Sequence, residues 1–285
     1  MELVPLDKIE SLLKDLKAKG KRIGRFGTTG KFHQGHVEGI RAAKNSADVV
    51  LVSFSDWIMD ADRLLNGEML SPYKRYRDQD LEFLDKLGFV DYVIERDLTN
   101  DIYNKIIELR DKVKENEELI LSTKLFKVKC PVPLKIINKI ALQLYPPPDS
   151  VLSDTTWCGD KDVAITLSAH LIAKKLGVPN NYKWFPVVRG EDGKPLSSRG
   201  FINSKINDPI EDNMFALFKE RIDQLRNTGR IPKLTGNARM IILETNTWKV
   251  VETLAKNKEY MVLYSDFVYD RGGCIKYEDC LRIMG

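Results

Sequence analysis

The residues best suited to chemistry lie together in one segment near the N-terminus, RFGTTGKFHQGHVEG (25–39). The chain has three histidines, and two of them, His33 and His36, stand in this segment, separated by a Gln-Gly dipeptide. A glycine turn that leads into a helix offers backbone N–H groups to a phosphate, and imidazoles beside it can donate hydrogen bonds as negative charge develops. The segment therefore predicts phosphate chemistry, although two surface histidines at a helix cap would show the same pattern.

Two close histidines are also compatible with a zinc site, which needs at least a third ligand. Neither His170 nor any pair of cysteines has a suitable spacing, so the sequence predicts no metal centre. We interpret the scattered cysteines as reduced thiols, because no signal peptide or long apolar run accompanies them, and we expect a cytoplasmic protein. The cysteines are Cys130, Cys158, Cys274 and Cys280.

Two other segments carry groups that suit a polyphosphate. In VVRGEDGKPLSSRG (187–200), hydroxyls and backbone amides can bind phosphate oxygens and Arg199 can hold them bidentately, although a solvated loop would have the same composition. In CGDKDVA (158–164), Lys161 follows a glycine at the predicted start of a helix. A lysine there opposes the helix dipole unless an anion is bound, so this position also favours phosphate binding.

Alternating strands and helices place these three segments. Apolar spacing and β-branched runs predict strands at 22–27, 47–55, 91–95, 118–123, 149–154 and 182–188, and helices at 9–20, 34–44, 76–88, 101–114, 133–145 and 161–177. Such an alternation is typical of an α/β protein with a doubly wound parallel sheet, in which ligands bind at the carboxyl ends of the strands. The histidine segment then follows one strand and opens the next helix.

The pattern changes after Gly200 to two helical stretches and a β-rich tail, YMVLYSDFVYD (260–270). We therefore predict a large domain over residues 1–200 and a smaller α+β domain or lid over 201–285. With 43% apolar and 30% charged residues, the chain has the composition of a soluble globular enzyme. Its net charge of +4 suits an anionic small molecule and a nucleic acid equally.

Together the three segments resemble the ATP-site motifs of the pantothenate synthetase (pantoate–β-alanine ligase) family, in the nucleotidyltransferase superfamily with HIGH and KMSKS signatures. TTGKFHQGH, GDKD and DGKPLSSR stand in the family's order, and the stretches SPYKRYRDQDLEFLDKLGFVDYV and PPDSVLSDTTWCGDKD resemble its sequence too. The resemblance runs from about residue 20 to about residue 203, and no family motif matches the C-terminal part. It implies a Rossmann-like nucleotidyltransferase fold whose 1–200 domain binds ATP, together with Mg2+.

The resemblance also implies a two-step reaction. A substrate carboxylate attacks the α-phosphorus of Mg-ATP to give an acyl-adenylate and pyrophosphate, and an amine then displaces AMP to form an amide. The implied catalytic residues are His36, its neighbour His33, Lys161, and Ser197, Ser198 and Arg199 over the triphosphate. The implied ATP-binding residues are Thr28, Thr29, Gly30, Gly35, Gly159, Asp160, Asp162, Val188 and Leu196.

The sequence departs from the family where the acid substrate is held. Thr29 replaces a methionine that flanks the acid, and two glutamines that hold it correspond to about Asp60 and to Ile165. The family's Arg-Pro-Gly-His-Phe stretch is replaced by FKVKCPVPLK (126–135). Loss of an amide partner costs a buried hydroxy acid about 1–3 kcal/mol per unsatisfied group, and Asp60 would repel a carboxylate but attract an amine. We therefore assign Asp60 and Ile165 to substrate binding and hypothesise that the acid, the amine or both differ from pantoate and β-alanine.

Two other functions remain open on the sequence. GRFGTTGKFHQGH (24–36) also resembles the opening of nicotinamide mononucleotide adenylyltransferases, and such an enzyme would move AMP or CMP onto a phosphorylated small molecule, releasing pyrophosphate alone. Alternatively, basic residues of the C-terminal part would bind a polyanion such as tRNA, but they alternate with acidic residues, which is typical of a solvated helix face. These basic residues are Lys205, Lys219, Arg221, Arg226, Arg230, Lys233 and Arg239. We expect small-molecule substrates without nucleic acid or membrane partners, and a homodimer is expected from the resemblance alone.

Overall fold

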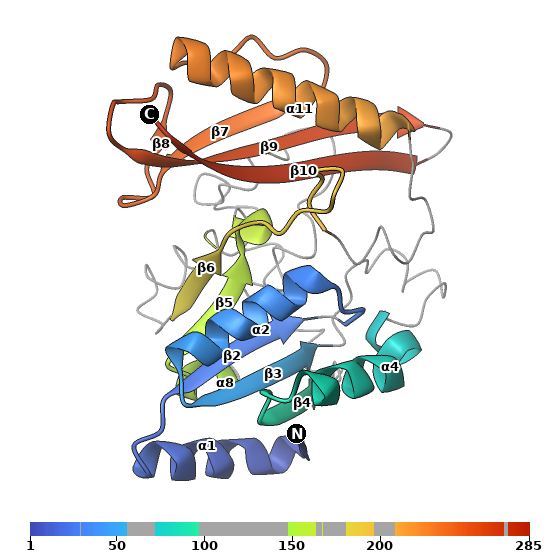
Figure 1. Cartoon of the computed structure of the whole chain (residues 1–285), viewed down its shortest axis with the longest axis vertical. Helices are drawn as coiled ribbons and strands as arrows, with labels where there is room; N and C mark the ends of the chain where they lie inside the picture. Colours follow the sequence, from blue (N-terminus) through green and yellow to red (C-terminus); the bar gives the residue numbers. More distant parts are fainter. Residues whose placement is uncertain are drawn as a thin grey trace, which may run out of the picture. The chain divides into compact units, whose positions relative to one another are not determined.

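The computed structural model describes residues 1–28, 30–55, 72–96, 148–163, 167, 181–196, 209–270 and 273–285 (Figure 1). These residues fall into two compact units, one within residues 1–185 and one within 186–285. Each unit has its own sheet and its own core. The predicted boundary near residue 200 lies outside the described residues and stays a prediction.

The first unit is built on a six-stranded sheet in which all neighbouring strands are parallel, in the order β1-β4-β3-β2-β5-β6. The strands span Glu2–Val4 (β1), Ile23–Thr28 (β2), Val49–Ser55 (β3), Tyr92–Arg96 (β4), Thr155–Gly159 (β5) and Tyr182–Phe185 (β6). The predicted strands at 22–27, 47–55, 91–95 and 182–188 are confirmed. The last of them ends at Phe185, because Pro186 has no N–H to donate to a strand ladder.

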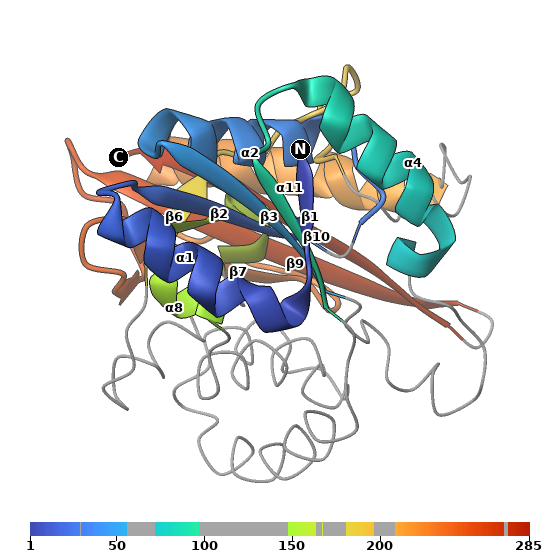
Figure 2. The same cartoon turned by 90° about the horizontal axis from the view of Figure 1, so that it is seen from below.

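Helices cover both faces of this sheet, which confirms the doubly wound arrangement (Figure 2). One face carries α1 (Ile9–Ala18) and α8 (Pro148–Leu152), and the other carries α2 (Gln34–Ser46) and α4 (Pro72–Leu87). Side chains of β3 alternate between the two cores, Leu51 on the α1 side and Val50, Val52 and Phe54 on the α2 side. A continuous apolar run is what burial on both faces requires.

The order of the strands reverses beside β2. From β2 the chain runs to β3 and β4 on one side, and it later returns to β5 and β6 on the other. The carboxyl ends of β2 and β5 are therefore neighbours, with Phe26 paired to Trp157. In open α/β sheets ligands bind at such a reversal, because the loops that leave the two strands separate there. The histidine segment follows β2 and the GDKD segment follows β5, so the fold brings both to this point.

Helix α2 lies close against the sheet because two glycines remove side chains from the contact. A Cβ on Gly24 of β2 would stand 2.7 Å from the carbonyl oxygen of Ala43. A Cβ on Gly39 of α2 would stand 2.3 Å from the Phe26 ring and 2.8 Å from the Phe185 ring. Larger residues at either position would push the helix outward. The position of the histidines at the start of α2 therefore depends on this packing.

One predicted element is wrong, because residues 149–154 do not form a strand. Residues Pro148–Leu152 form the short helix α8, and β5 begins at Thr155. Proline suits the first turn of a helix, and Val151 is 42% exposed, unlike a residue of a buried strand. The buried Asp149 carboxylate also accepts a hydrogen bond from Nε of Arg25 in β2 at 2.6 Å. This contact on the α1 side of the sheet contributes to holding the segment as a helix.

The predicted helices at 9–20, 34–44 and 76–88 are confirmed by α1, α2 and α4. Gly20 and Gly88 follow the ends of α1 and α4 with a φ of 71° each, the left-handed conformation that ends many helices. Of the predicted helix at 161–177, residues 161–163 and 167 are described: Lys161 and Asp162 lie in a 3-10 turn, and Val163 and Leu167 are helical and buried. The predicted elements at 101–114, 118–123 and 133–145 lie outside the described residues.

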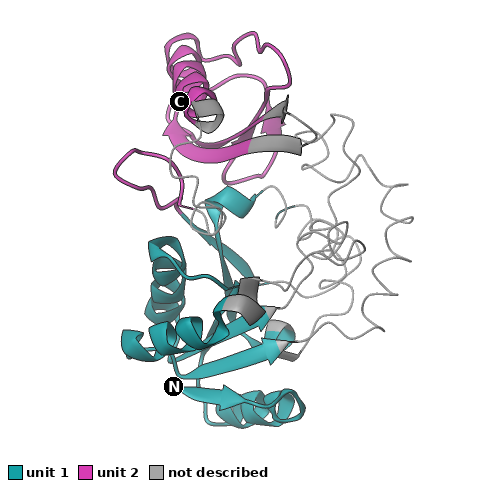
Figure 3. Cartoon of the chain, turned by 90° about the vertical axis from the view of Figure 1, so that its right-hand side faces the viewer, with its two compact units in different colours: residues 1–123, 131–185 teal, residues 124–130, 186–285 magenta. Residues whose placement is uncertain are grey.

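The second unit, magenta in Figure 3, is a four-stranded antiparallel sheet with one described helix packed on it. Its elements are α11 (Pro209–Thr228), β7 (Arg239–Glu244), β8 (Val250–Val251), β9 (Glu259–Asp270) and β10 (Gly273–Met284), and the strand order is β10-β9-β7-β8. Phe218 of α11 packs against Tyr264 and Tyr277 of the sheet in the core of this unit. The predicted β-rich tail is confirmed. Of the two predicted helical stretches, α11 is one, and the described residues of 209–285 contain no second helix.

Candidate active site

The two histidines of the first segment cap helix α2 reciprocally. His33 is the N-cap residue, and its Nδ1 accepts a hydrogen bond from the backbone N–H of Gly35 at 3.0 Å. The backbone N–H of His33 donates in turn to Nδ1 of His36 at 3.2 Å, and the ring centroids lie 4.1 Å apart. This is the geometry of a capping box, with two imidazoles in place of the usual hydroxyl and carboxylate.

These two hydrogen bonds decide where the imidazole protons lie. A neutral imidazole carries one N–H, and the nitrogen that accepts a hydrogen bond is the other one. Because Nδ1 is the acceptor in both rings, Nε2 bears the proton in both. Burial lowers the pKa of His33 to about 4, with the charge of Lys161 adding to the shift. Burial and the neighbouring His33 lower the pKa of His36 to about 3, against the opposing charge of Asp162. At pH 7 both rings are therefore neutral Nε2–H donors.

Side chains fix the turn that precedes α2. The hydroxyl oxygen of Thr28 accepts a hydrogen bond from the N–H of Gly30 at 3.1 Å. Gly30 and Lys31 then have φ values of 88° and 57°, and for a lysine this left-handed conformation costs on the order of 1–3 kcal/mol. The Asp80 carboxylate holds the turn, since it accepts hydrogen bonds from the N–H of Lys31 at 2.6 Å and of Phe32 at 3.0 Å.

Sequence reasoning missed Asp80, a residue of α4 that is 3% exposed. Burial raises the pKa of Asp80, while the two backbone donors oppose that shift. A signal was present, because Leu84 and Leu87 follow at helical spacing and pack in the core on the α2 side of the sheet. A carboxylate on an apolar helix face needs a buried partner, and here that partner is the backbone of the histidine turn.

Aromatic rings surround the histidine pair. Phe32 lies 5.1 Å from His36 between ring centroids and stacks on Phe83 of α4 at 5.4 Å. Phe26 of β2 meets His36 edge-on at 5.9 Å. These apolar rings cannot solvate an imidazolium, which is the physical reason why burial lowers the pKa of His36 so far.

The GDKD segment leaves β5 as a short 3-10 turn, η3 (Asp160–Asp162), with Gly159 at its start. Its charges act on the histidines. The charge of Lys161 contributes to lowering the pKa of His33, and the charge of Asp162 opposes the lowering of the pKa of His36. Such effects require the two segments to be close. The structure therefore brings together the described members of two predicted motifs at the reversal of the strand order: Thr28, Gly30, His33, Gly35, His36, Gly159, Asp160, Lys161 and Asp162.

The third segment belongs to the second unit and forms a hairpin. Arg189 and Pro195 face each other in an isolated bridge, and the N–H of Gly190 donates to the carbonyl oxygen of Lys194 at 2.9 Å. The N–H of Leu196 donates to the carbonyl oxygen of Val188 at 2.9 Å, so these two predicted ATP contacts are neighbours. Other predicted site residues lie outside the described ranges and their roles stay predictions: Thr29, Asp60, Ile165, Ser197, Ser198 and Arg199.

A sequence model of the family described as pantoate-beta-alanine ligase matches residues 4–265. The chain belongs to this family. The pantothenate synthetase of Thermodesulfovibrio yellowstonii is 28% identical over 235 residues, which cover 81% of this chain and 78% of the relative. The pantoate–β-alanine ligase of Schizosaccharomyces pombe is 28% identical over 232 residues, which cover 80% of this chain and 75% of the relative.

Solved structures of pantothenate synthetases share the fold. The protein from Thermus thermophilus gives a TM-score of 0.58 at 18% identity over 99% of both chains. The pantoate–β-alanine ligase from Francisella tularensis, complexed with β-γ ATP and β-alanine, gives a TM-score of 0.52 at 17% identity over 98% of this chain and 97% of that one. At these identities the likeness speaks for the fold, and it confirms the predicted nucleotidyltransferase-like sheet.

As a member of the pantoate–β-alanine ligase family, the chain is an ATP-dependent, AMP-forming ligase that joins a carboxylate and an amine in an amide. This decides between the two predicted enzyme classes, because the ligase family accounts for all three segments and the adenylyltransferase resemblance covers only the first. The family match also continues through β7 and most of β9, well beyond the predicted motifs. None of the described helices is long and apolar enough to cross a membrane.

Proposed function

We propose that the acid is adenylated at the reversal of the strand order, where His33, His36 and Lys161 contact the phosphates of ATP. The reciprocal cap is the observation that carries this proposal. It makes two imidazoles into neutral Nε2–H donors on the loop that leaves β2, and it places them within the electrostatic influence of Lys161 on the loop that leaves β5. Parallel strands, a cation and two fixed donors together suit an anionic nucleotide.

Such donors can stabilise the transition state of adenylation. Negative charge grows on the phosphoryl oxygens as the carboxylate attacks the α-phosphorus, and donors that are already in place stabilise it without reorganisation. Lys161 supplies the positive charge that the departing pyrophosphate needs. Removal of one donor of this kind lowers turnover about 100- to 1000-fold in other acyl-transfer enzymes.

The hairpin at 189–196 belongs to the same proposal. Val188 contacts the adenosine, and Leu196, Ser197, Ser198 and Arg199 close over the triphosphate. Magnesium enters as Mg-ATP, because Mg2+ is commonly held by substrate phosphates with few protein ligands. Within the described ranges no group of three or more His, Cys, Asp or Glu side chains is placed to hold a metal ion.

We further propose that the acid, the amine or both differ from pantoate and β-alanine. The support comes from the sequence, in which Thr29, Asp60 and Ile165 replace a methionine and two glutamines that hold the acid in the family. The relatives named for pantothenate synthesis are 28% identical, which leaves room for a changed acceptor site beside a retained ATP site. A homodimer and a cytoplasmic location belong to the proposal as well.

The first test measures the release of pyrophosphate and AMP from Mg-ATP by the purified protein. The panel of carboxylates and amines includes pantoate and β-alanine. AMP that appears only when an acid and an amine are both present supports the ligase and identifies its substrates. Efficient turnover of pantoate with β-alanine contradicts the altered specificity, and pyrophosphate release that requires a phosphorylated acceptor and gives no AMP contradicts the assigned chemistry.

A matched pair of substitutions separates the two roles of His33. Asparagine offers an acceptor oxygen near the position of Nδ1 and is a preferred N-cap, but it has no donor at the position of Nε2. We expect His33→Asn to keep wild-type stability and to adenylate about 100-fold more slowly. We expect His33→Gln, whose amide reaches the position of Nε2, to adenylate faster than His33→Asn but to lose about 1 kcal/mol of stability with its cap. A stable, fully active His33→Asn enzyme would show that His33 acts only as a cap.

A further inference from the structure

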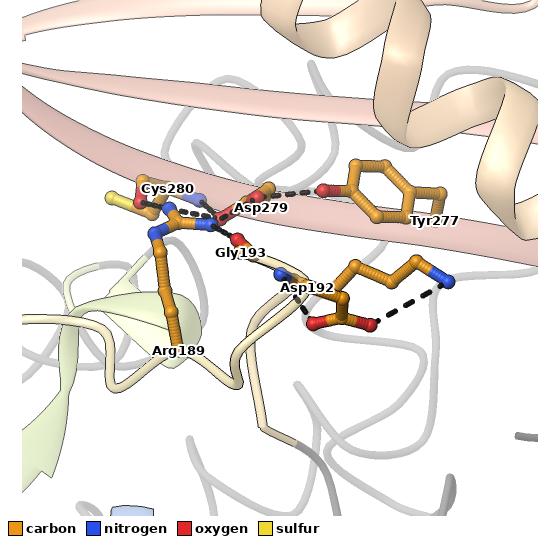
Figure 4. A network of polar contacts seen from close by, with 7 residues as sticks. Arg189, Asp192, Gly193, Tyr277, Asp279 and Cys280 are labelled. Atoms are coloured by element: carbon orange, nitrogen blue, oxygen red, sulfur yellow. Dashed lines mark hydrogen bonds and ion pairs between the residues drawn. The ribbon is translucent and has the colours of Figure 1, made fainter.

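Hydrogen bonds of Arg189 connect the hairpin at 189–195 to strand β10 of the second unit (Figure 4). The Arg189 guanidinium donates two hydrogen bonds to the Asp279 carboxylate, both at 2.8 Å. It also donates to the carbonyl oxygens of Gly193 at 3.0 Å and Cys280 at 3.1 Å. Arg189 therefore joins the two arms of the hairpin to each other and to β10.

The Asp279 carboxylate is held in place from its other side. Its side chain is completely buried, and it accepts hydrogen bonds from the Tyr277 hydroxyl at 2.6 Å and from the N–H of Cys280 at 2.7 Å. Tyr277 packs against Phe218 of α11 in the core of the unit. Burial alone would lower the pKa of Arg189, but the hydrogen bonds and the charge of Asp279 raise it, so the guanidinium stays charged.

A second ion pair holds the turn of the hairpin. Lys194 pairs with Asp212 of α11, and the Lys194 side chain is 17% exposed. The backbone N–H of Lys194 donates to Asp192 at 2.9 Å. Gly193 turns the chain with a φ of 79° against the Phe215 ring, which a Cβ would approach to 3.4 Å. The hairpin is thus fixed at two points, one on β10 and one on α11.

Stability alone does not account for the Arg189–Asp279 pair. Desolvation of two charges offsets most of their attraction, and an apolar pair of similar size often stabilises a fold equally well. A bidentate arginine–carboxylate pair instead provides direction, because both groups are planar and few orientations make both bonds. Here the pair orients a hairpin, and in the sequence this hairpin continues through Leu196 directly into Ser197, Ser198 and Arg199.

We propose that Arg189 is a positioning residue for the adenylation step, with Asp279 of β10 as its support. The ion pair sets the course of the hairpin as far as Leu196, from which the chain continues into the residues proposed to bind the triphosphate, so the C-terminal sheet has a part in the reaction. This inference rests on the proposed function of Ser197, Ser198 and Arg199. It predicts an effect on one half of the reaction only, because pyrophosphate has left before the amine attacks.

The test compares the two half-reactions of the full chain under single-turnover conditions. Pyrophosphate release from Mg-ATP and an accepted acid reports adenylation, and AMP release after an amine is added to the enzyme–adenylate complex reports transfer. Arg189→Lys keeps the positive charge but loses the planar guanidinium that makes two hydrogen bonds to Asp279, and Arg189→Ala removes both the charge and these bonds. Lys258→Ala, which removes an exposed ion pair with Glu244 in the same unit, is the matched control. We expect both Arg189 variants to slow adenylation about 10- to 100-fold and to leave transfer unchanged, and the control to change neither rate.

The variant Asp279→Asn provides a second part of the test. Because the two residues act as one unit, Arg189→Ala combined with Asp279→Asn should adenylate no more slowly than Arg189→Ala alone. A folded Arg189→Ala enzyme with the wild-type adenylation rate overturns the inference, and so does equal slowing of both half-reactions in Arg189→Lys. Failure of the proposed function is distinguishable, since adenylation would then be insensitive to Arg199→Ala or absent from the wild-type protein.

Discussion

Neither histidine of the capping pair should take up a proton in the range where ordinary histidines do. Burial lowers the pKa of His33 to about 4 and that of His36 to about 3, with Lys161 adding to the first shift and His33 to the second. At pH 5.5 a ring with a pKa of about 4 is about 3% protonated, whereas a ring with the ordinary pKa of about 6.5 is about 90% protonated. Acidification from pH 8 to pH 5.5 therefore separates the two cases clearly.

Two-dimensional 15N NMR of the imidazole rings measures both their charge and their tautomer. His33→Gln and His36→Gln each remove one set of signals and so assign the other sets, with His170 as the third ring. We expect His33 and His36 to remain Nε2–H tautomers throughout this pH range. Adenylation, measured by pyrophosphate release, should accordingly show no loss that follows a group with a pKa near 6.5 on either ring.

The same shifts make the stability of the first unit depend on pH. In the unfolded chain both pKa values return to about 6.5, so below that pH the unfolded chain binds protons that the folded chain does not. The stabilisation is fully present above pH 6.5 and is lost progressively as the pH falls from 6.5 toward the folded values. Between pH 7.5 and 5 the loss is at most about 2 kcal/mol per histidine, and nearer 1 kcal/mol because both rings keep some contact with water. Urea unfolding at the two pH values should show this loss in the wild type and a smaller one in His36→Gln.

A ring that titrates near pH 6.5, or an Nδ1–H tautomer in either ring, would refute this reasoning. Either result would mean that the backbone hydrogen bonds to Nδ1 do not persist in solution and that the imidazoles meet phosphate as cations. The unfolding experiment is an independent check. If wild type and His36→Gln lost the same stability on acidification, His36 would bind the same number of protons in the folded and unfolded chains.

Three substitutions test other parts of the site. Asp80→Asn leaves one backbone donor of the histidine turn without an acceptor, so we expect a loss of about 1–3 kcal/mol in urea unfolding and slower pyrophosphate release; wild-type values would mean that the turn is held otherwise. Gly39→Ala presses a methyl group on the Phe26 and Phe185 rings, and overpacking of about 1–3 kcal/mol should outweigh the gain of about 1 kcal/mol in helix propensity. Its melting temperature should fall, and a rise would show that the rings move freely. Lys161→Ala should keep its melting temperature but lose adenylation by orders of magnitude, and an unchanged rate would remove Lys161 from the site.

The elements around the site could be predicted because their patterns are local. The apolar run that forms β3 and the glycines that follow α1 and α4 are visible within a few residues of sequence. The grouping of His33, His36 and Lys161 could also be predicted, since loops that leave the carboxyl ends of parallel strands share one edge of the sheet. The bounds of β5, which begins after the strand predicted at 149–154, and its position beside β2 had to come from the structure.

Contacts between distant residues could not be predicted in the same way. Arg25 meets Asp149 across 124 residues, and this pair contributes to making a helix of a segment with the composition of a strand. Asp80 holds a backbone N–H that lies 49 residues before it. The Arg189–Asp279 pair spans 90 residues. Each carboxylate is buried, and burial is a property of the folded chain that the neighbouring sequence does not record.

The structure gives a physical reason why a chain with three histidines places two of them within four residues. Helix α2 has no Ser, Thr, Asp or Asn at its N-cap, so its first N–H groups need another acceptor, and the two Nδ1 atoms serve. The same hydrogen bonds fix the tautomer of each ring and leave Nε2–H on its opposite side as a donor. A serine would cap the helix without reaching as far as an imidazole, and a histidine without the cap would be able to rotate and ionise. Helix initiation and phosphate chemistry therefore depend on the same two hydrogen bonds, and a replacement that keeps the acceptor of the cap, such as His33→Asn, is needed to separate them.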